Sequence, residues 1–300
     1  MMVTTVVAPR RIGFVGLGAM GLPMAKNLVA GGFAVQGYDI RPEARSALSA
    51  VGGVAADSAA GAFDGADAAV LMVVDVIQAE SVLFDADALA ALAPGAVVIL
   101  MATAPPQRVA AIAERVRAAG YGFVDAPVSG GVVGAAAGTL TIMAAGEGDA
   151  IARVRPLLDV LGDKIVTVGC RPGQGATAKA VNQLLCGAHL AVAAEALSLA
   201  ETLGLDMDQM LDIVSGSAAS SWMLKDRGPR MIEIEPPVTS AVDIFVKDLG
   251  IVLETGRDAK AALPMAALAH QLFLSVSGRG FGALDDSQVI RAYRALGSGR

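Results

Sequence analysis

The sequence predicts an α/β Rossmann-type, doubly wound domain followed by an all-helical C-terminal domain, because the chain changes character once. From residue 11 to about residue 169, short β-branched runs alternate with longer Ala-, Leu- and Arg-rich stretches. This alternation is typical of a mostly parallel sheet covered by helices. After Gly173 the strand-like runs stop and helical patterns continue. We therefore expect an N-terminal extension at 1–10, a sheet domain at 11–170 and a helical domain at 171–300.

The strands of the first domain are expected where β-branched residues cluster. The run Ala68–Val74 is almost continuously apolar, which is typical of a strand buried on both faces. The predicted strands are Ile12–Val15, Ala34–Tyr38, Ala68–Val73, Val97–Ile99, Gly122–Val124, Leu140–Met143 and Ile165–Val168. The predicted helices between them are Ala19–Ala30, Arg41–Ala50, Pro106–Ala119 and Asp149–Leu161.

The second domain begins with a long predicted helix that runs to about Leu203 and spans about 45 Å at 1.5 Å per residue. Its middle, Ala180–Ala194, contains no charge, so we expect burial on most sides. Pro264 at a first-turn position and Asp285 as an N-cap mark two later helix starts. The later predicted helices are Asp206–Ser215, Ser221–Glu233, Ser240–Ala261, Pro264–Ser277 and Asp285–Leu296.

Composition argues against several classes of protein. With 29 acidic and 23 basic residues the net charge is -6, which disfavours nucleic-acid binding. The two cysteines suit a reducing cytoplasm, and no Cys/His cluster predicts a metal site. The N-terminus does not resemble a signal peptide, because its basic pair, Arg10 and Arg11, follows the short apolar stretch and does not precede it. Two uncharged stretches, Ala88–Gln107 and Ala126–Gly146, are interrupted by Pro or Gly and indicate strand and loop, so no membrane association is expected.

A glycine-rich motif directly follows the first predicted strand and opens the first helix. In such a motif the first glycine permits a tight turn, the second lets the backbone approach a pyrophosphate, and the third permits close packing of helix on strand. Without its context the motif is also compatible with an ordinary loop. The predicted cofactor loop comprises Gly16, Leu17, Gly18, Ala19, Met20 and Gly21.

An acidic residue completes the dinucleotide motif. Asp39 ends the second predicted strand, 23 residues after Gly16, where a carboxylate accepts hydrogen bonds from ribose hydroxyls and repels a 2′-phosphate. NAD is therefore predicted over NADP. Arg41 leaves room for a phosphate, and its alternative role is that of a solvated residue at a helix start.

The candidate catalytic residue is Lys179, the sole lysine of the long apolar helix. Burial lowers the pKa of a lysine toward neutrality, where it can exchange protons with a substrate. Asn182 and Gln183, three and four residues later, share a helical face with Lys179 and can orient a substrate hydroxyl. The alternative is that Lys179 reaches the surface and Asn182 only bonds the backbone. His189 and His270 are expected to be core histidines.

A third segment, Asp125–Gly131, follows a strand and offers backbone N–H groups beside a hydroxyl. Ser129, Gly130 and Gly131 can together hold a carboxylate, and the alternative is an ordinary glycine-rich turn.

Taken in order, these segments resemble the β-hydroxyacid dehydrogenase family, which includes 3-hydroxyisobutyrate dehydrogenase and tartronate semialdehyde reductase. The resemblance extends from Ile12 to Leu296 and includes Lys247-Asp248-Leu249. It implies a Rossmann domain joined by a long helix to a helical domain that dimerises. It also implies Lys179 as the catalytic lysine, Asn182 and Ser129–Gly131 as substrate contacts, and Lys247 as a residue that closes over cofactor and substrate.

One segment departs from the family pattern. Where the family often has Ser-Thr-Ile-Ser-Pro, this chain has Ala102-Thr103-Ala104-Pro105-Pro106. The cofactor contact implied for Thr103 is retained, but both flanking serines are lost.

Substrate and partners follow from the resemblance. Ser221–Arg227 is similar to the L-threonate dehydrogenase branch, which oxidises four-carbon sugar acids, although Trp222 and Arg227 have core packing and a surface ion pair as alternatives. We expect a small carboxylate substrate and a homodimer or homotetramer. Alternative activities are 3-hydroxyisobutyrate dehydrogenase and tartronate semialdehyde reductase. An imine reductase is disfavoured by Lys179, and a non-catalytic dinucleotide-binding scaffold by the three segments together.

Overall fold

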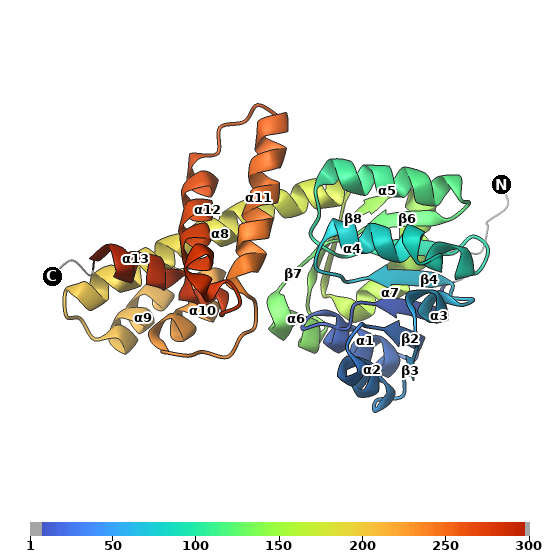
Figure 1. Cartoon of the computed structure of the whole chain (residues 1–300), viewed down its shortest axis with the longest axis horizontal. Helices are drawn as coiled ribbons and strands as arrows, with labels where there is room; N and C mark the ends of the chain where they lie inside the picture. Colours follow the sequence, from blue (N-terminus) through green and yellow to red (C-terminus); the bar gives the residue numbers. More distant parts are fainter. Residues whose placement is uncertain (1–7, 298–300) are drawn as a thin grey trace. The chain divides into compact units, whose positions relative to one another are not determined.

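The computed structural model describes residues 8–297 and divides into two compact units, Met1–Lys179 and Ala180–Arg300. Most of the predicted N-terminal extension, residues 1–7, lies outside the described residues. The division falls inside one continuous helix, α8 (Gln174–Thr202), whereas the sequence analysis places the domain boundary at its beginning. Figure 1 shows the elements of both units, coloured along the chain.

The N-terminal unit is built on one nine-stranded sheet with the order β3-β2-β1-β4-β5-β6-β8-β7, in which β9 also pairs with β8. The pairs among strands β1 to β6 are all parallel, while β8 is antiparallel to β6 and to β7. The predicted doubly wound, mostly parallel sheet is thus confirmed. Its strands are β1 (Arg11–Val15), β2 (Ala34–Tyr38), β3 (Val54–Ala55), β4 (Ala68–Leu71), β5 (Val97–Leu100), β6 (Gly122–Asp125), β7 (Val128–Ser129), β8 (Thr141–Gly146) and β9 (Lys164–Gly169).

Helices cover both faces of this sheet, because successive strand residues point to opposite sides. Val97 and Ile99 of β5 join one buried cluster with α1, while Val98 and Leu100 join a second cluster with α5. Figure 1 shows α1 and α5 on opposite sides of the sheet. The helices of this unit are α1 (Gly21–Ala30), α2 (Pro42–Ser49), α3 (Ala59–Phe63), α4 (Val76–Glu80), α5 (Pro106–Ala118), α6 (Gly131–Ala137) and α7 (Gly148–Leu161).

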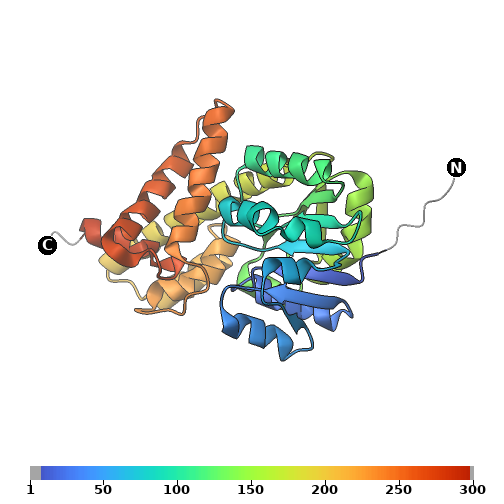
Figure 2. The same cartoon turned by 45° about the vertical axis from the view of Figure 1, so that its right-hand side comes forward.

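The C-terminal unit is helical in its described residues, as predicted, apart from one isolated bridge between Ala241 and Asp285. Helices α11 and α12 lie side by side, as Figures 1 and 2 both show, and Phe245 stacks on Phe273 between them. Residues of α8, α10, α11 and α12 share one buried apolar cluster. The helices are α9 (Met207–Gly216), α10 (Trp222–Ile232), α11 (Val242–Asp258), α12 (Pro264–Val276) and α13 (Ile290–Gly297).

Helix α8 is as long as predicted, but its expected burial on most sides is wrong for the single chain. Val181, Leu185, Val192 and Leu199 lie 50 to 62% exposed and repeat at helical spacing along one side. By length and composition alone, α8 would also suffice to cross a membrane, a test that core helices of soluble proteins pass as well.

Candidate functional site

The predicted cofactor residues gather at one edge of the sheet. Gly16, Asp39 and Thr103 follow β1, β2 and β5, and parallel strands end at the same edge. The connections reverse direction between β1 and β4, which is where doubly wound sheets bind dinucleotides. Thr103 is half-buried between β5 and α5.

The glycine loop has the geometry that the motif predicts. Gly16 has φ +96°, a conformation that disfavours side chains. A Cβ on Gly21 would lie 1.8 Å from the carbonyl oxygen of Gly16, so close packing needs glycine there. A Cβ on Gly18 would meet only the Arg41 guanidinium, at 3.8 Å, and therefore stands clear of the backbone. The loop fits a pyrophosphate, which would approach the open position at Gly18.

The rest of the loop is held by Asp39. Its Oδ2 accepts the N–H of Leu17 at 2.8 Å, and its Oδ1 accepts the N–H of Arg41 at 2.9 Å. Leu17 is buried, Met20 packs against the apolar cluster of α1, and Ala19 is exposed. The backbone groups of the loop thus keep one orientation relative to the end of β2.

Arg41 is not only a solvated residue at a helix start. Its guanidinium lies 3.0 Å from Oδ1 of Asp39 and also donates to the carbonyl of Leu17. Burial alone would raise the pKa of Asp39, but hydrogen bonds from Arg41 and Leu17 and the charge of Arg41 together lower it below the usual value. Asp39 therefore stays ionised at neutral pH.

Lys179 lies in the second turn of α8 and is 7% exposed. The alternative in which it reaches the surface is therefore wrong. The first turn of the same helix is bound by Asp125, whose Oδ2 accepts the N–H groups of Gly173 and Ala176, both at 2.9 Å. Asp125 lies in the predicted Asp125–Gly131 segment, but its own role is not evident from the sequence.

The predicted carboxylate loop is more regular than a turn. Val128–Ser129 forms β7, and Gly131 begins α6, so the loop is reduced to Gly130. Gly130 and Gly131 both have positive φ, at 134° and 62°. Ser129 and Gly130 are half-buried, which leaves part of their surface for a ligand.

The predicted polar residues of the C-terminal unit form one chain of contacts. Asn182 donates from Nδ2 to Oε1 of Gln183 at 2.9 Å, and Gln183 donates from Nε2 to Oδ2 of Asp248 at 2.6 Å. The ammonium of Lys247 lies 2.8 Å from Oδ1 of Asp248. The structure thus links Asn182, Gln183 and Lys247 through a buried carboxylate to which the sequence analysis assigns no role.

The predicted site residues therefore fall into two groups, one in each compact unit. Lys179 belongs to the same unit as the cofactor loop and Ser129–Gly131, and the Asn182 chain of contacts belongs to the other. Lys179 and Asn182 are nevertheless three residues apart on one continuous helix, α8.

Three expectations for the C-terminal unit are corrected. Arg227 forms a buried ion pair with Asp286, with Nε 2.9 Å from Oδ1, rather than a surface one. Trp222 is 53% exposed and is not core packing. His189 is exposed and His270 half-buried, so His189 is not a core histidine.

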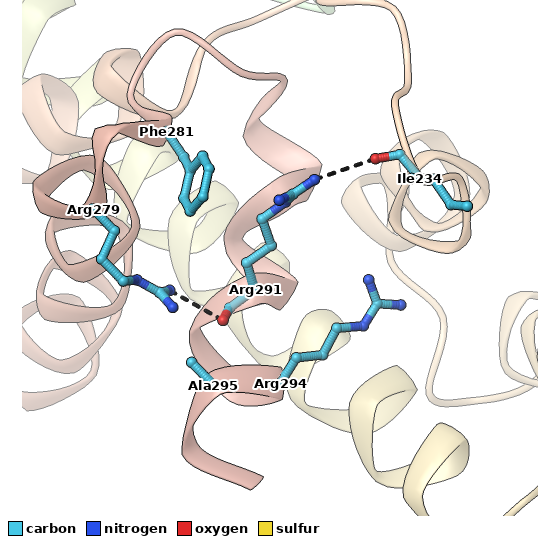
Figure 3. Close-up of a pocket in the computed structure, with 6 residues that line it drawn as sticks. All are labelled: Ile234, Arg279, Phe281, Arg291, Arg294 and Ala295. Atoms are coloured by element: carbon cyan, nitrogen blue, oxygen red, sulfur yellow. Dashed lines mark hydrogen bonds between the residues drawn. The ribbon is translucent and has the colours of Figure 1, made fainter. Parts of the chain in front are cut away.

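A separate hollow of about 420 Å³ lies in the C-terminal unit, and Figure 3 shows the side chains around it. Arg279 donates to the carbonyl of Arg291 at 3.0 Å, and Arg291 donates to that of Ile234 at 3.3 Å. These arginines hold backbone segments together, and the hollow contains none of the predicted site residues. Its lining residues are Ile234, Arg279, Phe281, Arg291, Arg294 and Ala295.

Within residues 8–297, no group of three or more His, Cys, Asp or Glu residues could hold a metal ion. The polar groups of the described site are instead backbone N–H groups, aspartate carboxylates, the side-chain amides of Asn182 and Gln183, and a lysine. These groups suit an organic cofactor and a carboxylate substrate.

Comparisons with known proteins agree with this geometry. Residues 11–169 match the NAD binding domain of 6-phosphogluconate dehydrogenase. Residues 173–293 match the model described as NAD-binding of NADP-dependent 3-hydroxyisobutyrate dehydrogenase.

Individual relatives cover nearly the whole chain. An L-threonate dehydrogenase of Cupriavidus necator is 42% identical over 96% of this chain and 97% of its own length. A 2-hydroxy-3-oxopropionate reductase of Escherichia coli (strain K12) is 33% identical over 95% of this chain and 98% of its own.

Among solved structures, one described as 3-hydroxyisobutyrate dehydrogenase from Salmonella typhimurium has a TM-score of 0.90 and 39% identity. It covers 94% of this chain and 99% of its own. The chain therefore belongs to the 3-hydroxyisobutyrate dehydrogenase-like family of NAD(P)-dependent hydroxyacid dehydrogenases.

Proposed function

We propose that this β-hydroxyacid dehydrogenase oxidises a four-carbon sugar acid such as L-threonate with NAD, and that Lys179 exchanges the proton. The observation that carries the proposal is the burial of Lys179, a single 7% exposed lysine near the start of α8. A buried amine is costly to keep charged, so this position favours a lysine that gives up and takes back a proton.

The residues of the chain divide the work between binding and proton transfer. Ser129, Gly130 and Gly131 hold the substrate carboxylate through hydroxyl and backbone donors. Gln183 accepts from Nδ2 of Asn182, and we assign the remaining Oδ1 of Asn182 to the substrate hydroxyl. Neutral Lys179 accepts the hydroxyl proton at Nζ during oxidation and returns it during reduction. When bound, the nicotinamide supplies the hydride acceptor.

The preference for NAD rests on Asp39 and Arg41. Asp39 is ionised and 8% exposed, and its charge opposes a 2′-phosphate on the adenosine ribose. The guanidinium that would otherwise neutralise this phosphate is already bonded to Asp39 and to the carbonyl of Leu17. Binding of a 2′-phosphate by Arg41 would compete with both contacts.

The substrate is argued from similarity. The L-threonate dehydrogenase is 42% identical to this chain, and the 2-hydroxy-3-oxopropionate reductase 33%. The segment Ser221–Arg227 does not add a substrate contact by itself, because Arg227 is committed to a buried ion pair with Asp286 and to a second ion pair with the half-buried Asp226. The alternatives are therefore 3-hydroxyisobutyrate and the product of tartronate semialdehyde reduction, glycerate.

A substrate panel tests the proposal. The purified protein is mixed with NAD or NADP and with L-threonate, 3-hydroxyisobutyrate or glycerate, and NADH or NADPH formation is followed by absorbance. We expect the highest kcat/KM with L-threonate and NAD. A higher kcat/KM with another acid would contradict L-threonate as the substrate but would still support a hydroxyacid dehydrogenase.

The variant Lys179→Ala tests the role of the lysine. We expect turnover to fall by about 10²- to 10⁴-fold, the usual contribution of a positioned acid or base, while NAD still binds. Lys164→Ala is a matched control, because Lys164 is an exposed lysine of β9 in the same unit. Near-normal turnover of Lys179→Ala would contradict the proposal.

We also propose that the chain forms a homo-oligomer through the exposed apolar side of α8. Val181, Leu185, Val192 and Leu199 form a continuous apolar stripe, which water solvates poorly. Light scattering coupled to size-exclusion chromatography is expected to give a dimer or tetramer, and Val192→Glu is expected to reduce that mass. An unchanged mass in the variant would move the interface elsewhere.

A further inference from the structure

Asp125 holds the beginning of α8 from a distant strand. It ends β6, is 1% exposed, and receives the N–H groups of Gly173 and Ala176 on its Oδ2. The N–H of Gly175 also bonds to it. The first N–H groups of a helix have no partner within the helix, so a single carboxylate here satisfies the first turn.

Close packing at this junction leaves little freedom for the turn. A Cβ on Gly175 would lie 2.9 Å from Cγ of Asp125 and 2.6 Å from the carbonyl oxygen of Met143. Gly173 has φ +93° and lies against the carbonyl of Pro106. The helix start is therefore held by β6, β8 and α5, and Asp125 supplies its polar contact.

Lys179 lies three residues after Ala176, which is about 4.5 Å along the helix axis. The placement of the first turn therefore determines the placement of the lysine backbone. A displacement of about 1 Å at reacting groups can lower a rate about 100-fold.

We propose that Asp125 is a positioning residue, which fixes the first turn of α8 and so places Lys179 for proton transfer. The proposal rests on the proposed role of Lys179, but its geometry can be tested separately. Asp125 touches neither substrate nor cofactor in this scheme and acts only through the helix.

No cation among the described residues contributes to the pKa shift of Asp125. In the sheet its neighbours are Leu100 on β5 and Ala145 on β8, which do not titrate. Lys179 is the nearest charged residue along α8. Burial raises the pKa of Asp125 to about 6, although hydrogen bonds from Ala176, Gly173 and Gly175 oppose the rise.

Protonation has two opposing effects on this contact. The hydrogen bonds to Oδ2 would lose the contribution of the negative charge. The cost of burying that charge would also disappear, and the raised pKa means that this second effect is the larger. We therefore expect the helix start to stay anchored as the pH falls below about 6.

Hydrogen exchange tests the geometry without activity. In full-length Asp125→Ala, we expect the amides of peptide 170–180 to exchange at least about tenfold faster than in the wild type. Asp125→Asn keeps an acceptor oxygen and should restore most of the protection. Unchanged exchange in Asp125→Ala would overturn the anchoring role, whatever the role of Lys179 proves to be.

Kinetics test the positioning role. We expect Asp125→Ala to lower kcat about 10- to 100-fold with a KM for NAD within about twofold of the wild type. Asp125→Asn should recover most of this loss at about pH 8. Asp206→Ala is the matched control, because Asp206 also caps a helix, α9, and accepts the N–H of Gln209 at 2.8 Å. If Asp125→Ala speeds exchange but leaves kcat unchanged, Asp125 caps the helix without positioning Lys179, and the proposal is contradicted.

Discussion

The ends of β2 and β6 both carry a buried aspartate that accepts backbone N–H groups, yet the two carboxylates differ in charge behaviour. Asp39 lies 3.0 Å from the guanidinium of Arg41, and its pKa is lowered. Asp125 has only backbone donors, and burial raises its pKa to about 6. At Asp125 the backbone hydrogen bonds alone therefore do not offset the rise in pKa that burial causes. At Asp39 an adjacent cation helps to offset that rise.

The two positions suit different tasks. The role proposed for Asp39, exclusion of a 2′-phosphate, needs a carboxylate that stays charged at physiological pH, and Arg41 contributes to this. A carboxylate that only receives N–H groups can function with a pKa near neutrality. The same residue type at the same edge of the sheet thus serves either as a fixed charge or as a titrating anchor.

The largest expected effect concerns stability and tests the absence of a cation at Asp125. Its pKa is about 6 in the folded chain against an ordinary value of 3.8 for an exposed aspartate, so the folded state favours the protonated form. The stability that this group contributes is therefore present below about pH 4 and lost as the pH rises through 6, by about 3 kcal/mol.

Urea unfolding of the wild type and Asp125→Asn at several pH values measures this difference. Groups such as Asp39 and Asp285 have lowered pKa values and act in the opposite direction, but they are shared by both proteins and cancel. A difference in unfolding free energy that does not change between pH 4 and 7 would contradict the assignment.

The second prediction concerns Asp39. Asp39→Ala is expected to lower kcat/KM for NAD about 30-fold, because hydrogen bonds to a charged group are worth about 2 kcal/mol. The ratio of kcat/KM for NAD over NADP should fall. Asp57→Ala is the control, since Asp57 is a fully exposed acid of the same unit. A constant ratio would show that Asp39 does not select the cofactor.

The smallest effect is expected from Arg41→Ala, which makes the end of β2 resemble the end of β6. Arg41 is half exposed, so its loss should change kcat/KM for NAD by no more than about fivefold. The pKa of Asp39 should rise, because burial remains and the cation is gone. Titration of this carboxyl by nuclear magnetic resonance measures the shift. An unchanged pKa would show that Arg41 is not what distinguishes Asp39 from Asp125.

Much of the fold follows from local pattern. The predicted β-strands of the parallel part and helix α8 are present with ends shifted by a few residues at most. The elements that the sequence analysis omits are short or rich in glycine and alanine, such as β3 and α6, where neither periodicity nor a cap distinguishes helix from loop.

Site residues can be proposed from the sequence only where one segment carries the signal. The glycine loop and Lys179 are proposed from patterns formed by residues that are neighbours in the sequence. The roles of Asp125 and Asp248 depend on contacts with residues 48 and 65 positions away, Gly173 and Gln183. Such pairs cannot be read from the spacing of one chain.

Because Lys179 ends one compact unit and Ala180 begins the other, the division of α8 has a consequence for protein engineering. A chimera joined between these two residues would keep the cofactor loop, Asp125 and the lysine together while importing Asn182, Gln183 and Lys247 from a relative. Under the proposed mechanism, exchanging helical units at this junction would change the contacts assigned to the substrate hydroxyl while leaving the proposed proton-transfer lysine and its anchor in place.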